Sequence, residues 1–281
     1  MPTFSTPSPI DLAINLQVGR IDVVAGDRQD TVVTVSPTSE GKAVDRRGAE
    51  ETKVDFDGER LTITGPKPRF SIIGPTESVD LVIELPSGSR FTADIPVGSV
   101  RTTGRLGATR VKASTGAVDL DGTGDLWVRA GHGSIVVGSA DGGIELIADH
   151  GNIRVGTVSG DTIMKSSHGN IGVDVCGGDL DAKLSYGDLE IGKARGSVTA
   201  KTAYGSIQVH EVASGSIDLE SGYGGLTVGV LPGVPAWLDL SSREGRVRNA
   251  LDGDGAPEPG EQSVAVRART HFGDIDIQRA R

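Results

Sequence analysis

The chain has 281 residues, 36% of them hydrophobic, and a formal net charge of −10 at pH 7. This acidic balance argues against nucleic acid as the main partner, because phosphate binding requires a dominant positive field. The single cysteine, Cys176, excludes an intramolecular disulfide bond, and no apolar run reaches the length of a transmembrane span.

The N-terminus carries no targeting pattern. Residues 1–9 have neither the basic region nor the hydrophobic region of a secretory signal peptide. We therefore expect a cytoplasmic protein.

Residues 1–97 predict an N-terminal β cap that includes a first coil of a repeating structure. Apolar residues alternate from Ile10 to Leu16, and a glycine-led strand phrase follows at residues 18–23. Short turns at Asp57-Gly58 and at Pro86-Ser87-Gly88 suit antiparallel hairpins. A cap is expected because the end of a strand stack would otherwise offer bare edges to other chains. Further strands are expected at residues 31–35, 53–56, 61–64, 79–85 and 90–95.

Two stretches inside this cap differ from the rest. Residues 40–51 are highly charged, which predicts an exposed loop. Phe70, Ile72 and Ile73 lie between prolines, which restrict the chain. They form either a docking loop for a partner or an apolar flap that folds back over the core, and we favour the flap.

Residues 98–230 predict a regular β-solenoid, because glycines recur about every nine residues. Most are followed by alternating apolar residues, as in Gly133-Ser-Ile-Val-Val. The glycine allows a corner and the alternation predicts a short strand with one buried face. A short fixed period indicates a stack of similar units. The glycines are Gly98, Gly107, Gly116, Gly124, Gly133, Gly142, Gly151, Gly160, Gly169, Gly178, Gly187, Gly196, Gly205, Gly215 and Gly224.

The true repeat is about 18 residues, because alternate nines end in a ring residue before the next glycine. One coil is then two strands and two corners, with coils about 4.8 Å apart. The fold class is therefore all-β, a parallel β-solenoid (β-helix) with β-rich end caps. Ile153 should be fully buried, so Ile153→Asp should damage the fold. The column of ring residues contains His132, His150, His168, Tyr186, Tyr204 and Tyr223.

Residues 231–281 predict a C-terminal cap and a closing coil. Pro232 and Pro235 interrupt the nine-residue period. The glycine-led strand phrase returns at residues 243–249 and 271–277. We expect a single structural domain in which residues 1–97, 98–230 and 231–281 form the N-terminal cap, the regular coils and the C-terminal cap.

Several of these motifs carry a resemblance to a known family. They are the strand phrase at residues 18–23, the repeated corners with Tyr-Gly or His-Gly, the segment 236–249 and the closing segment 268–275. In this order they resemble the bacterial β-strand-repeat family called "putative adhesin" or toastrack, in its soluble actinobacterial form. The resemblance implies a β-solenoid with no established enzyme activity and no catalytic residues, and we expect no cofactor. It also implies a link to envelope-stress or adhesion-type systems.

The ring column could bind a metal through His132, His150 and His168. Zinc requires nitrogen ligands at about 2.0–2.1 Å in a tetrahedral arrangement. Tyrosine continues the column without a change of period, so we favour stacked rings over a metal site.

Acidic residues offer a second candidate site. Asp161 and Asp179 follow corner glycines on neighbouring coils, and a pair of carboxylates could act as acid and base on a polysaccharide. Aspartate after glycine is also ordinary turn chemistry, which we favour. A calcium-binding repeat is not expected, because the nearest approach, at residues 177–181, lacks the required spacing.

A basic column is the best candidate binding surface. Its members stand five residues after the glycine in alternate nines, and Arg110 and Trp127 flank the first of them. A cationic stripe beside a tryptophan could bind an anionic polymer or surface. The alternative is a solvated face with internal ion pairs, such as Asp181 with Lys183. The candidate binding residues are Lys112, Trp127, Arg129, Lys165, Lys183, Lys201 and Phe70.

Two function classes follow from the sequence. We favour a non-enzymatic scaffold for protein–protein or surface interaction, with an unidentified protein partner. The alternative is a metal-binding or polysaccharide-processing protein that uses the histidine column or the Asp161 and Asp179 pair.

Overall fold

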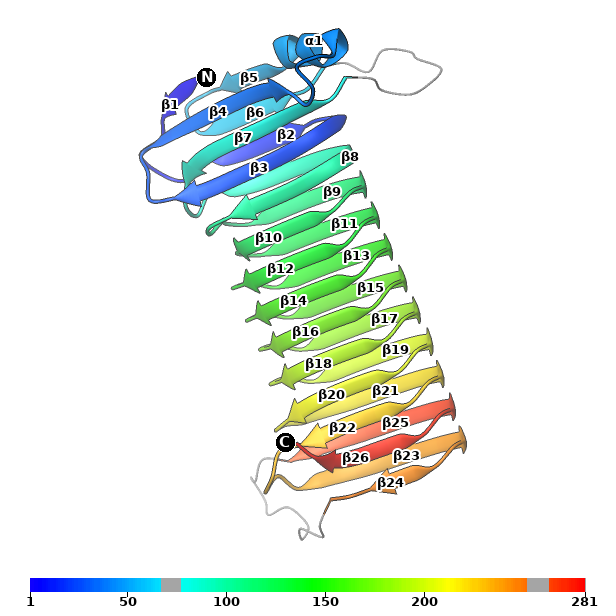
Figure 1. Ribbon diagram of the computed structural model, residues 1–281. Helices are drawn as coiled ribbons and strands as arrows, with labels where there is room; N and C mark the ends of the chain where they lie inside the picture. The colour runs from blue at the N-terminus through cyan, green and yellow to red at the C-terminus, as the bar shows by residue number, and fades with distance from the viewer. Residues whose placement is uncertain (67–76, 252–262, 281) are drawn as a thin grey trace. The chain divides into compact units, whose positions relative to one another are not determined.

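The computed structural model describes residues 1–66, 77–251 and 263–280. The chain consists of two compact units, Met1–Ala140 and Asp141–Arg281. In both units short strands follow one another along the chain and stack as parallel coils (Figure 1). The fold is therefore the all-β parallel solenoid that the repeat predicts. The predicted divisions at residues 97 and 230 stay a prediction.

The first unit contains three regular coils beneath its cap. The coils are formed by the long strand β8 and by the pairs β9/β10 and β11/β12, whose members are parallel from coil to coil. The elements are β1 (Thr3–Ser5), β2 (Asp11–Asn15), β3 (Val18–Gly26), β4 (Asp30–Pro37), α1 (Ala43–Glu51), β5 (Lys53–Phe56), β6 (Arg60–Thr64), β7 (Val79–Pro86), β8 (Arg90–Thr103), β9 (Thr109–Thr115), β10 (Val118–Thr123), β11 (Leu126–His132) and β12 (Ile135–Ala140).

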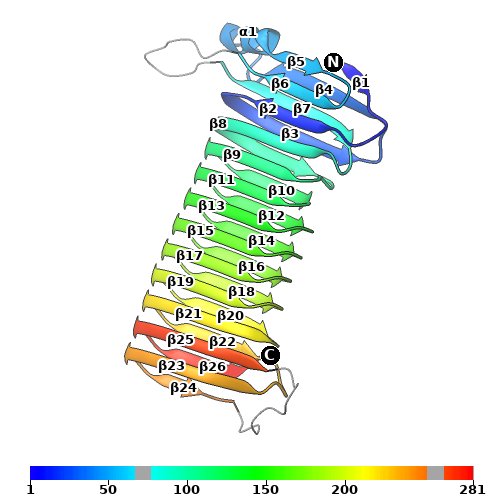
Figure 2. The same cartoon turned by 180° about the vertical axis from the view of Figure 1, so that it is seen from behind.

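The cap is built on two further coils. Strands β2 and β3 pair in parallel with β8, and β6 and β7 pair in parallel with β2 and β3. Beyond them β4, β5 and β1 pair in antiparallel fashion, and α1 packs on β4 and β7. Figure 2 shows these elements gathered at the end of the first unit. The outer edges of β6 and β7 are thus paired with β5 and β4.

Two details of the cap differ from expectation. The turn at Asp57-Gly58 does join antiparallel strands, but the turn at residues 86–88 does not, because β7 and β8 are both parallel to β3. The prediction of an antiparallel hairpin at this second turn was wrong. The turn is a corner of the coil.

The prediction of an exposed loop at residues 40–51 was also wrong, because Ala43–Glu51 is a helix. Its charges have partners elsewhere in the cap. Asp45 is buried and accepts a hydrogen bond from the backbone N–H of Ser78 at 3.1 Å, and Arg47 pairs with Glu77 at 2.8 Å. These contacts stabilise a charged segment that would be an open loop on composition alone.

The second unit carries the most regular coils. Residues directly opposite each other on neighbouring strands are 18 apart in sequence from β13 to β20, as with Lys165, Lys183 and Lys201. The strands are β13 (Ile144–His150), β14 (Ile153–Val158), β15 (Thr162–His168), β16 (Ile171–Cys176), β17 (Leu180–Tyr186), β18 (Leu189–Ala194), β19 (Val198–Tyr204), β20 (Ile207–Val212), β21 (Gly215–Tyr223), β22 (Leu226–Val230), β23 (Ala236–Glu244), β24 (Val247–Asn249), β25 (Val264–Phe272) and β26 (Ile275–Arg279).

The C-terminal segment adds two coils in an order that differs from the sequence. Strands β25 and β26 pair with β21 and β22 on one side and with β23 and β24 on the other. The final strands of the chain therefore lie inside the stack, and β23 and β24 form its last coil (Figure 1).

The core consists of the inward-facing aliphatic side chains of every coil. Ile153 is 0% exposed, which confirms its predicted burial, and Val155 and Ile171 are 2% and 1% exposed. Each such side chain contributes about 1.5–3 kcal/mol of hydrophobic free energy when fully buried. This alternation leaves the intervening side chains to form columns on the outer faces.

Candidate functional site

The candidate site lies on the first strands of the coils in the second unit. Lys165, Lys183 and Lys201 occupy matching positions on β15, β17 and β19 and all point outward. Ile147 precedes them on β13 and Glu220 follows them on β21. We call the surface formed by Lys165, Lys183, Lys201, Ser167 and Ser185 the lysine face.

The three lysines differ in how far neighbouring acids neutralise them. Lys201 pairs with Glu220 at 2.7 Å, and Lys183 lies 3.4 Å from Asp181 on its own strand. The hydrogen bond to Glu220 raises the pKa of Lys201, and the same bond lowers the pKa of the Glu220 carboxyl. Among the residues that the structure describes, Lys165 has no ion-pair partner.

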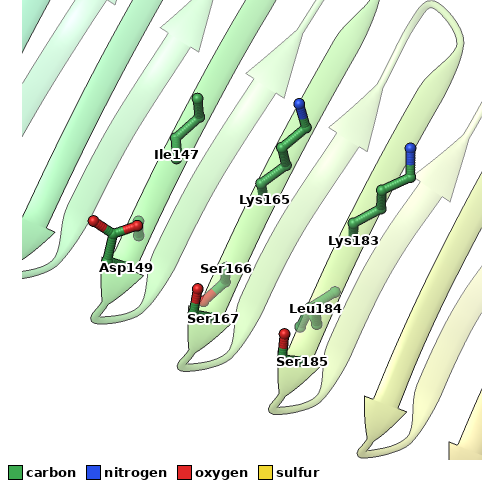
Figure 3. A pocket seen from close by; sticks show the side chains of 9 residues that line it. Ile147, Asp149, Lys165, Ser166, Ser167, Lys183, Leu184 and Ser185 are labelled. Carbon is green, nitrogen blue, oxygen red and sulfur yellow. The ribbon is translucent and has the colours of Figure 1, made fainter.

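A shallow hollow of about 210 Å³ lies along these strands, with Lys165 and Lys183 on one side. Figure 3 shows the two lysine side chains extending in the same direction, with the shorter Ser167 and Ser185 nearer the corner. Asp149 occupies the equivalent corner position on β13. Ammonium and hydroxyl groups are both donors suited to carboxylate, sulfate or phosphate oxygens.

The ring column forms the border of this face. Within the second unit neighbouring ring centroids lie 4.7–5.0 Å apart with interplanar angles of 2–14°. The tyrosines remain 47–50% exposed, so the column points outward and its ring edges face solvent. The stacked rings are His150, His168, Tyr186, Tyr204, Tyr223 and Phe272.

This geometry bears on the metal alternative. His150 and His168 stack face to face with centroids 4.8 Å apart, and His168 stacks in the same way on Tyr186. The predicted ring stacking is thus seen in the second unit, whereas His132 belongs to the first. Over the described ranges no three His, Cys, Asp or Glu side chains gather as metal ligands would.

The corner acids accept hydrogen bonds from the backbone of the next coil. Asp161 Oδ1 accepts the backbone N–H of Asp179 at 3.1 Å, and Asp179 Oδ1 accepts that of Ser197 at 2.8 Å. A second series at the opposite corner runs from Asn152 through Asn170 and Asp188 to Ser206. These carboxylate and amide oxygens hold one coil to the next, because each acceptor and its donor are 18 residues apart and not within one turn.

The first unit holds the remaining members of the predicted basic column. Lys112 lies 3.8 Å from Asp94, and the guanidinium of Arg110 stacks 3.8 Å over the ring of Trp127. Arg129 stands opposite Lys112 and is exposed. Trp127 therefore has an intramolecular partner. Phe70 lies outside the described residues, as do Ile72 and Ile73.

The sequence matches a known protein family over most of its length. The profile of Toastrack DUF4097 matches residues 11–278. This chain belongs to that toastrack family. The match covers both compact units and confirms the resemblance seen in the sequence motifs.

Two solved structures are similar to this toastrack chain. One is a "putative cell adhesion protein" from Clostridium sporogenes, 13% identical with a TM-score of 0.21, where the match covers 99% of this chain and 98% of that chain. The other is a "putative adhesin" from Bacteroides fragilis, 12% identical with a TM-score of 0.36, where it covers 98% and 95%. No curated protein matches the chain.

The cysteine of this toastrack chain lies in the core. Cys176 is buried, and burial raises the pKa of its thiol, so it is the small core residue that was expected. Within residues 1–66, 77–251 and 263–280, no helix has both the length and the apolar composition needed to cross a membrane.

Sequence reasoning missed three features of the face. It did not single out Ser167 and Ser185, although they recur seven residues after a corner glycine. It ended the ring column at Tyr223, whereas Phe272 continues it because β25 lies next to β21. It named the pair of Asp181 with Lys183 on one strand, but not the pair of Lys201 with Glu220, which depends on the neighbouring strand.

Proposed function

We propose that this toastrack protein is a non-enzymatic scaffold that binds an acidic protein partner on the lysine face. The sequence resemblance to the family supports a role in an envelope-stress or adhesion-type system. The use of Asp161 and Asp179 as backbone acceptors supports a role without catalysis.

The proposal depends mainly on the positive charge of Lys165, which no ion pair within the described residues neutralises. Its side chain lines the hollow on the outer face of β15 and has no ion-pair partner in the described part of the chain. Lys201 makes a close pair with Glu220 and is less available to a ligand. A partner that supplies carboxylates to Lys165 and Lys183 would gain charge-assisted hydrogen bonds.

The experiment uses the full chain and a fluorescent oligo-glutamate peptide as the acidic probe. Binding is followed by fluorescence anisotropy at low and at high salt. We expect the double variant Lys165→Gln/Lys183→Gln to raise the Kd about tenfold, since an exposed ion pair contributes up to about 1 kcal/mol. Salt should weaken wild-type binding, because surface charges are screened.

Two matched variants sharpen the test. Lys193→Gln removes an exposed lysine on β18 that pairs with Glu211 at 3.0 Å, and it should leave the Kd unchanged. Glu220→Gln frees Lys201 and should lower the Kd. If Lys193→Gln, which removes one charge, raises log Kd by half as much as the double variant, which removes two, only net charge matters and the proposal is overturned.

The same variants identify the partner in native cells. Affinity capture with the wild-type chain should recover a protein that the double variant fails to retain and that Lys193→Gln retains. The cytoplasmic location expected from the sequence stays a prediction, and fractionation of native cells tests it.

A further inference from the structure

Among the described residues, the last coil of the second unit has an unpaired strand edge. Strand β23 pairs with β25 and strand β24 pairs with β26, and on their other sides neither has a strand neighbour among the described residues. A strand edge of this kind presents backbone N–H and C=O groups that are free to pair with another chain.

The interior is also less covered in this coil. Leu238 and Leu240 are only half-buried, whereas Val266 and Ala268, opposite them on β25, are 2% and 0% exposed. Val247 on β24 is 46% exposed. The described part of the stack therefore ends with aliphatic side chains that are partly exposed. Burial under a further layer of side chains would stabilise them.

Two copies of strand β23 have complementary side chains when they run antiparallel to each other. Trp237 and Arg243 lie at equal distances on either side of Leu240, and both are exposed. Trp237 is 61% exposed, and Arg243 has no ion-pair partner in the ranges that the structure covers. In an antiparallel pair centred on Leu240, Trp237 of each strand would stand directly opposite Arg243 of the other.

The same kind of contact occurs within the chain, between parallel strands. Arg110 and Trp127 are directly opposite each other on β9 and β11, and the guanidinium lies 3.8 Å from the ring centroid. Centring the pair on Leu240 also sets Asp239 opposite Ser241. A centre at Asp239 would instead place two aspartates against each other.

We infer that two copies of the chain associate through antiparallel pairing of β23 about a two-fold axis at Leu240. Leu238, Leu240 and Trp237 become buried, and each Trp237 receives an arginine from the other copy. The contact is isologous, so it closes after two chains. It involves no residue of the lysine face and is independent of the proposed function.

The first test is cross-linking of the full chain. Opposite residues of an antiparallel pair have Cα atoms about 4.5–5.5 Å apart, within the range that a disulfide bond spans. Leu240→Cys should form a covalent dimer under mild oxidation. Trp237→Cys, whose counterpart is Arg243, and Thr199→Cys, exposed on β19, should not. The native Cys176 is buried and should not contribute.

The second test measures mass by sedimentation equilibrium. Wild type should show a species of twice the 29.0 kDa of one chain. Trp237→Ala and Arg243→Glu change exposed side chains, so the fold should persist by circular dichroism while the dimer Kd rises about tenfold or more. Lys165→Gln/Lys183→Gln should leave the dimer intact. A 29.0 kDa wild-type species at every concentration, or a dimer indifferent to Arg243→Glu, would overturn the inference.

Discussion

Gly187 shows how close the coils come at the ring-bearing corner. Its φ is 141°, a conformation that side-chain-bearing residues rarely adopt. A Cβ at this position would lie 2.2 Å from the carbonyl oxygen of Gly169 on the preceding coil. The corner therefore needs glycine both for its backbone angle and for its spacing.

We expect Gly187→Ala to lower the free energy of unfolding by at least about 1–3 kcal/mol, the cost of a strained backbone alone. The matched control is Gly172→Ala on β16, where a Cβ would meet nothing within 4 Å. That change should be neutral or stabilising, because alanine reduces the entropy of the unfolded chain. Urea titration of both variants measures the difference, and equal losses would contradict the spacing argument.

Residue burial could be predicted from the sequence, but charge pairing between neighbouring strands could not. Ile153 follows a corner glycine by two residues, so its inward position comes from alternation alone. The availability of Lys165 depends instead on which acids stand beside it on neighbouring strands. The pattern of the repeat places a lysine in the column but does not say whether it is neutralised.

At the scale of elements, the ring column is a ladder that crosses several strands. Tyr204 stacks on Tyr186 and on Tyr223 with centroid distances of 4.9 Å on both sides. Because these rings are about half exposed, their contribution comes from ring contact more than from burial.

Tyr204→Ala should therefore cost about 1–3 kcal/mol, since two aromatic contacts of about 0.5–1.5 kcal/mol each are lost. Tyr204→Phe keeps both contacts and should be close to neutral. Thermal and urea unfolding of the two variants provide the measurement. A large loss in the phenylalanine variant would show that the hydroxyl, and not the stacking, stabilises the column.

Strand prediction succeeded where local alternation decides the structure and failed where distant contacts do. The strands from residue 98 onward follow from the period. Helix α1 was missed because its stability depends on Ser78 and Glu77, which lie about 30 residues away in sequence. The corner at residues 86–88 resembles a hairpin turn locally, and only the pairing with β3 distinguishes the two.

At the scale of the whole molecule, the order of coils in space was beyond the sequence. The placement of β25 and β26 between two earlier coils leaves no local signal, since each strand has the same alternating pattern wherever it is inserted. The period of 18 residues, by contrast, is directly readable and leads to a test on the complete chain.

Removal of residues 170–187 deletes one full coil and joins Gly169 to Asp188, which restores a Gly-Asp corner. We expect this variant to fold with a cooperative transition and slightly lower stability, because each coil interacts mainly with its neighbours. Removal of residues 170–178 is the control, since it moves every later ring residue to the opposite corner. That variant should lose its cooperative transition in circular dichroism. Similar melting curves for both deletions would contradict an 18-residue unit.

The corner acceptors of the second unit have a direction. From Asn152 to Ser197, each donor N–H belongs to a residue 18 positions after the side chain that accepts it. During synthesis on the ribosome, the acceptor therefore emerges before the strand it will hold. A nascent chain can therefore add one coil at a time to the coils already folded, from β13 to β22. Strands β23 and β24 are the exception, because their partners β25 and β26 are synthesised after them.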